Sequence, residues 1–90
     1  MYNVRIFIEG KVFKTGYRFF VKQIADQLYI HGKVQYLDDG IMIEAHGEQA
    51  KLEEFVRLCR IGNLDSKIKS IKVNNVLSKT FKSFEIENAN

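Results

Sequence analysis

Residues 34–45 read VQYLDDGIMIEA and predict two strands joined by a tight turn. The turn is Asp38-Asp39-Gly40, whose Asp-Gly step tolerates the positive φ that tight hairpins need. Apolar residues recur at every second position on both sides of the turn, at Val34, Tyr36, Ile41, Ile43 and Ala45. This period of two is typical of strands with one buried face. We therefore expect a β-hairpin in the middle of the chain. Elements from the flanking segments must cover its buried face.

Helical patterns lie on both sides of this hairpin. Before it, apolar residues recur at helical spacing, at Phe20, Val21, Ile24, Ala25 and Leu28. Gly32 is the expected stop of that helix. After the hairpin, the same spacing recurs at Leu52, Phe55, Val56 and Cys59, and the pattern ends near Gly62. Each predicted helix has a single apolar stripe, so each needs one surface to pack against.

Strand patterns begin and end the chain. Val4, Ile6 and Ile8 alternate with Arg5, Phe7 and Glu9 and predict a first strand that ends at Gly10. Ile71 and Val73 predict a fourth strand, and Phe84 and Ile86 predict a short fifth strand after a connection at residues 78–80. The order is β-α-β-β-α-β. Two helices with one apolar stripe each must cover the same side of a largely antiparallel sheet, so we expect an α+β sandwich of the ferredoxin-like type.

Composition narrows the class of protein further. The 90 residues are 46% hydrophobic and 12% aromatic and contain no proline, which favours a globular chain without linkers. We expect residues 1–90 to form a single domain. Cys59 is the only cysteine, so an internal disulfide is excluded, and its place on a helix stripe predicts a core residue. The net charge of +3 is mild, and neither an export signal nor a membrane span is predicted, so we expect a cytoplasmic protein.

The candidate site is the segment between the first strand and the first helix, residues 10–18, which read GKVFKTGYR. This segment leads into a helix N-terminus, where backbone N–H groups lack partners and the helix dipole favours an anion. Arg18 adds a planar guanidinium that can bind a phosphate or a carboxylate through two hydrogen bonds. A cation at this end of a helix opposes the dipole unless an anion lies between them. From these residues alone, a solvated arginine in an ordinary loop is the simpler interpretation.

The same residues carry a resemblance to a known family. Gly10, Val12, Tyr17 and Arg18 match the spacing of the acylphosphatase signature G-x-V-x-G-V-x-F-R. Residues 32–34 and 39–40 resemble the family's second signature on the central hairpin, and the predicted last strand resembles its closing strand. The sequence thus resembles the acylphosphatase family over nearly the whole chain, in the same order of elements.

This resemblance implies hydrolysis of the mixed carboxylic–phosphoric anhydride of acyl phosphates, without a metal or a cofactor. Arg18 would be catalytic, and the phosphoryl group would also be held by the backbone amides of Phe13, Lys14, Thr15, Gly16 and Tyr17. The family's asparagine, which orients the attacking water, falls at Tyr36. The expected partner is a small acyl phosphate or inorganic phosphate bound to a monomer, with no role for membrane or nucleic acid.

The chain departs from the family's pattern within both signatures. Phe13, Lys14 and Thr15 replace the family's glutamine, glycine and valine, and lysine tolerates the positive φ of that glycine poorly. Tyr36 lacks the paired donor and acceptor of an amide. The alternative hypothesis is therefore a non-catalytic anion-binding domain of acylphosphatase type. An RNA-binding module is the weakest hypothesis, because Phe7 is the only base-stacking aromatic predicted on the first and third strands.

Overall fold

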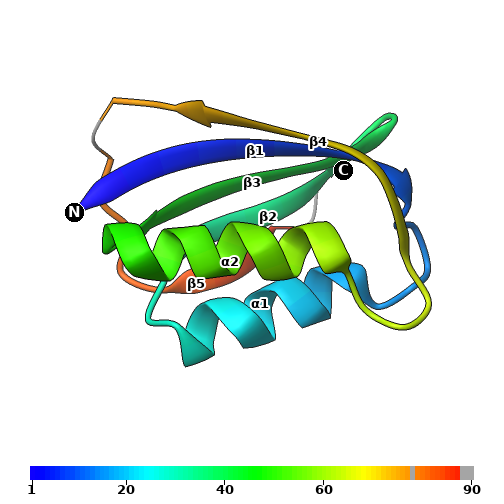
Figure 1. Ribbon diagram of the computed structural model, residues 1–90, viewed down its shortest axis with the longest axis horizontal. Coiled ribbons are helices and arrows are strands. Elements are labelled where there is room, and N and C mark those ends of the chain that lie inside the picture. Colours follow the sequence, from blue (N-terminus) through cyan, green and yellow to red (C-terminus); the bar gives the residue numbers. More distant parts are fainter. Residues whose placement is uncertain (78, 88–90) are drawn as a thin grey trace.

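A computed structural model describes residues 1–77 and 79–87 as a five-stranded sheet with two helices (Figure 1). The elements are β1 (Tyr2–Lys11), α1 (Tyr17–Gln27), β2 (His31–Leu37), β3 (Gly40–Gly47), α2 (Gln49–Ile61), β4 (Lys67–Asn75) and β5 (Phe84–Glu87). This order confirms the predicted β-α-β-β-α-β arrangement, followed by the short fifth strand. Of the predicted segments, Ser78 and residues 88–90 lie outside the described residues.

The strands lie side by side in the order β4-β1-β3-β2-β5. β1 pairs antiparallel with β3 and β4, β2 pairs antiparallel with β3, and β5 pairs parallel with β2. Because β4 and β5 form opposite edges, the chain between them passes from one edge of the sheet to the other (Figure 1). The sheet is therefore mostly antiparallel, as predicted, and β3 is its central strand.

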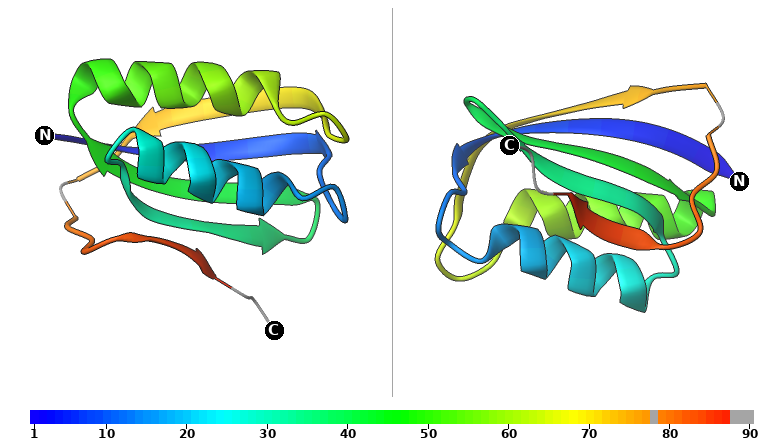
Figure 2. Two further views of the ribbon diagram at one scale, coloured as in Figure 1. Left: turned by 90° about the horizontal axis from the view of Figure 1, so that it is seen from below. Right: turned by 180° about the vertical axis from the view of Figure 1, so that it is seen from behind.

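Both helices cover the same face of this sheet (Figure 2). The residues that alternate inward along the strands meet the helix stripes and form one core, with Ile6, Ile43 and Phe55 completely buried. Cys59 belongs to this core, and burial raises the pKa of its thiol to about 12. The thiol is therefore protonated at neutral pH, which agrees with the predicted core role. Neither helix of the described chain is long and apolar enough to cross a bilayer.

The first helix ends earlier than expected, and by a different residue. Tyr29, not Gly32, adopts the left-handed conformation after α1, at φ 58°. The Ile30 N–H donates to the Ala25 carbonyl at 2.8 Å across this turn, a pattern that closes helix C-termini. Gly32 instead lies inside β2. Gly32 was therefore the wrong prediction for the end of the helix. A hydrogen bond holds the left-handed position at Tyr29, so no glycine is needed there.

The hairpin turn also differs from its prediction. β2 ends at Leu37 and β3 begins at Gly40, so the turn residues are Asp38 and Asp39. Among the described residues, Lys14 and Tyr29 are the only non-glycine positions with positive φ, and Gly40 is not a positive-φ glycine. The hairpin was predicted correctly, but the positive φ at its Asp-Gly step was wrong. The strand pairing, not left-handed turn residues, maintains this connection.

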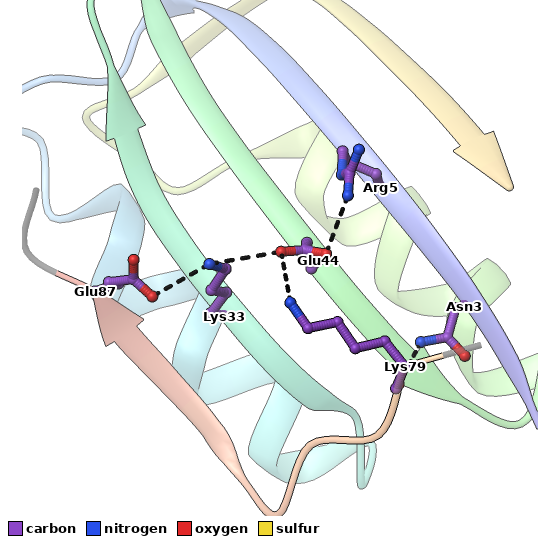
Figure 3. Close-up of polar contacts among 6 residues, drawn as sticks. All are labelled: Asn3, Arg5, Lys33, Glu44, Lys79 and Glu87. Carbon is purple, nitrogen blue, oxygen red and sulfur yellow. Dashed lines mark hydrogen bonds and ion pairs between the residues drawn. The ribbon is translucent and has the colours of Figure 1, made fainter. Parts of the chain in front are cut away.

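The face of the sheet opposite the helices carries an ion-pair cluster around Glu44. The Glu44 side chain is only 7% exposed, and its carboxylate lies 3.4 Å from Arg5, 3.6 Å from Lys33 and 3.9 Å from Lys79 (Figure 3). The Asn3 side-chain amide donates to the Lys79 carbonyl at 2.6 Å (Figure 3). These contacts fasten the segment before β5 to β1 and β3, so they help bring β5 beside β2.

Candidate functional site

The candidate site is formed by the loop that connects β1 to α1. Gly16, at φ 76°, is the residue before α1, and no side chain caps the helix. The first turn of α1 contains no acidic residue, although Arg18 is its second residue. The amide groups of a first helical turn lack partners within the helix, and they are positively polarised. This end of α1 therefore combines amide donors with a cation, which suits an anionic ligand.

Hydrogen bonds from two directions hold the loop in place. The Thr15 hydroxyl donates to the Val12 carbonyl at 2.7 Å, and both side chains are buried. The Asn63 side-chain amide donates to the Thr15 carbonyl, also at 2.7 Å. Asn63 follows α2, far from the loop in sequence, and it belongs to no motif that could have identified it. It is a supporting residue that the sequence analysis missed.

Lys14 adopts a left-handed backbone, at φ 59°, in the middle of this loop. This is the position where the acylphosphatase signature has a glycine, and it is where lysine was expected to fit poorly. The left-handed conformation of Lys14 is nevertheless present. The next two residues are Thr15, which is held by two hydrogen bonds, and Gly16, which is also left-handed at φ 76°. The loop thus keeps a left-handed backbone despite the loss of the glycine.

We expect Lys14→Gly to raise the free energy of unfolding by roughly 1 kcal/mol. An L-residue in the left-handed region costs about 1–2 kcal/mol, of which the extra freedom of glycine in the unfolded chain cancels a part. Urea unfolding of the wild type and the variant measures the difference. Lys14→Ala is the matched control, because it removes the same charge and keeps a Cβ. If Lys14→Ala raises the free energy of unfolding by as much as Lys14→Gly, the effect comes from the lost charge and not from backbone strain.

The structure brings three of the predicted residues together in a stack. The Arg18 guanidinium carbon lies 3.9 Å from the centre of the Tyr36 ring. The centres of the Phe13 and Tyr36 rings are 4.7 Å apart, with the rings tilted by 33°. The Tyr36 ring therefore contacts both the Arg18 guanidinium and the Phe13 ring. Tyr36 points to the same side of β2 as the buried Val34, toward the helices, and is thereby in contact with Arg18.

Tyr17 takes a different position from the rest of the loop. Its side chain is fully buried, and its hydroxyl donates to the Cys59 carbonyl at 2.7 Å. Burial raises the pKa of the Tyr17 hydroxyl well above its usual range. The side chain therefore joins α1 to α2 in the core, and only the backbone of Tyr17 can contact a ligand at the loop.

Known proteins resemble this chain in sequence and in structure. A family model described as acylphosphatase matches residues 4–86. The acylphosphatase of Archaeoglobus fulgidus is 30% identical over 87 residues, which cover 96% of this chain and 98% of that protein. The acylphosphatase of Bacillus subtilis is 36% identical over 74 residues, which cover 81% of each chain.

A solved structure agrees with these sequence matches. The crystal structure of acylphosphatase from Bacillus subtilis superposes with a TM-score of 0.93 at 31% identity, covering 97% of this chain and 99% of that one. The similarity therefore extends over the fold described above and over both of the segments that form the candidate site. On this evidence the chain belongs to the acylphosphatase family, whose members are hydrolases of acyl phosphates.

Proposed function

We propose that the protein cleaves the carboxyl–phosphate bond of an acyl phosphate at the loop of residues 13–18. Arg18 binds the phosphoryl group, together with the backbone amides of Phe13 to Tyr17. The observation that carries this proposal is the position of Arg18 in a first helical turn without acidic residues, next to a loop with left-handed residues at Lys14 and Gly16. Membership of the acylphosphatase family indicates the reaction. The position of Arg18 in a helix turn without acidic residues supports this loop as the place where the reaction occurs.

The chemistry that this site can supply is positioning and charge stabilisation. Water attacks the phosphoryl group, the bond to the acyl oxygen breaks, and the products are a carboxylate and inorganic phosphate. The guanidinium donors lie in one plane and can hold two phosphoryl oxygens at once. Donors that are already oriented stabilise the negative charge of the transition state more effectively than mobile water does. Arg18 and the loop amides thus account for binding and for part of the catalysis.

We expect Tyr36→Asn to raise the turnover number by about tenfold, because an oriented amide donor and acceptor can position the attacking water. The measurement is steady-state hydrolysis of benzoyl phosphate. Phosphate affinity, measured in parallel, reports separately on the loss of the ring beside Arg18. If turnover does not rise, the replacements at Phe13 and Lys14 limit the rate instead of Tyr36.

Hydrolysis by the wild-type chain tests the proposal directly. We expect benzoyl phosphate to be hydrolysed faster than in buffer, and inorganic phosphate to inhibit competitively. The position of Tyr36 against Arg18 favours one alternative, a domain that binds anions without turnover. Phosphate binding in calorimetry without any hydrolysis would establish that alternative, and the absence of both would refute the proposed site.

We further propose that residues 1–90 act as a single acylphosphatase-like domain, monomeric and cytoplasmic, on small molecules and not on nucleic acid. A single cysteine is consistent with a reducing compartment. Within the described part of β1 and β3, Phe7 is the only phenyl or phenol ring on the face away from the helices, too few for stacking successive bases. Light scattering should give a mass near 10.5 kDa.

A further inference from the structure

Phe13 is an exposed aromatic residue that is nevertheless held in a defined position. Its side chain is 42% exposed, yet its ring stacks on Tyr36 at 4.7 Å between centres. Tyr36 is itself partly buried against the core and also contacts the Arg18 guanidinium. The Phe13 ring therefore connects the partly buried Tyr36 to the surface of the loop.

Phe13 belongs to the loop that is proposed to hold the phosphoryl group. Phe13 is the first residue of the loop whose amides bind the phosphoryl group, and the next residue, Lys14, is an exposed cation. Phe13 and the Arg18 guanidinium both contact the Tyr36 ring. The part of Phe13 that stays in water adds no apolar burial to the fold, so this surface is available to contact a ligand.

We infer that Phe13 is a specificity-determining residue that favours aromatic acyl groups over small aliphatic ones. The inference rests on the proposed function, because it places the substrate's phosphoryl group at Arg18. In an acyl phosphate, the acyl carbon is separated from phosphorus by a single oxygen, so the acyl group must leave the site within a few ångströms of the phosphoryl group. A planar acyl group can then cover the exposed part of the Phe13 ring, whereas an acetyl group is too small to cover much of it.

The experiment compares benzoyl phosphate with acetyl phosphate in the wild type and in Phe13→Ala. The measured quantity is the ratio of kcat/KM for the two substrates, since their different intrinsic reactivities cancel when the ratios are compared between variants. We expect Phe13→Ala to lower the benzoyl-to-acetyl ratio about fivefold, the range typical of one aromatic contact. Phe19 is the matched control, because it is a 68% exposed phenylalanine on α1, and Phe19→Ala should leave the ratio unchanged.

Binding of two non-hydrolysable anions separates this inference from the proposed function. Benzylphosphonate should bind the wild type several-fold more tightly than methylphosphonate, and Phe13→Ala should remove that preference. If neither phosphonate binds and neither substrate is hydrolysed, the proposed function fails. If both phosphonates bind with equal affinity, or if Phe13→Ala changes neither ratio, the proposed function stands and the role of Phe13 is refuted.

Discussion

Replacing Arg18 with alanine is expected to abolish phosphate binding and to reduce the hydrolysis of acyl phosphates by at least about a thousandfold. Removal of one oriented donor from a charge-stabilising site costs about a hundredfold to a thousandfold, and Arg18 supplies several such donors together with a full charge. Steady-state hydrolysis of benzoyl phosphate measures the loss of turnover. Calorimetric titration with phosphate measures the loss of binding.

Arg18→Lys provides the matched control for this prediction. Lysine keeps the positive charge, but it cannot stack a planar group on Tyr36 or donate two parallel hydrogen bonds. We therefore expect phosphate binding that is weaker than in the wild type and stronger than in Arg18→Ala. Thermal unfolding of both variants shows whether the fold survives. Unchanged phosphate affinity in a folded Arg18→Ala protein would rule out Arg18 as the phosphoryl-binding residue.

The second large effect is expected for Gly10→Ala, which should lower the free energy of unfolding by more than about 3 kcal/mol. Gly10 has φ 143°, and a Cβ there would lie 2.1 Å from the Lys67 carbonyl oxygen. The register between β1 and β4 shifts at Glu9 and Gly10, so both backbones approach closely at this irregularity. An alanine must therefore push β1 away from β4 just before the site loop begins.

Gly16→Ala, in the site loop, is the control for Gly10→Ala. Gly16 is also left-handed, at φ 76°, but the nearest atom to its Cβ would be the Asn63 side-chain nitrogen at 3.7 Å. Only conformational strain remains, so we expect a loss of about 1 kcal/mol. Urea unfolding measures both variants. Equal losses would show that the backbone contact at Gly10 contributes nothing beyond its φ.

The elements of the fold were predictable because their patterns are local. Alternation at Val4, Ile6 and Ile8 and helical spacing after Phe20 each reflect which side chains of one segment are buried together. The predicted helix end and turn conformation were less accurate. Tyr29 closes α1 with a left-handed backbone that a residue with a Cβ disfavours, and a hydrogen bond back into the helix holds it there.

The loop and its arginine could also be identified in the sequence, since Gly10, Val12, Tyr17 and Arg18 lie close together in one signature. The surroundings of Arg18 could not be identified in this way. Tyr36 reaches Arg18 only because β2 folds back beside the start of α1, and Asn63 reaches Thr15 only because the end of α2 lies against the loop. Sequence periodicity reports which face of a segment is buried, whereas contacts between distant segments depend on how the segments pack. The stack beside Arg18 and the support of the loop are therefore properties of the folded chain.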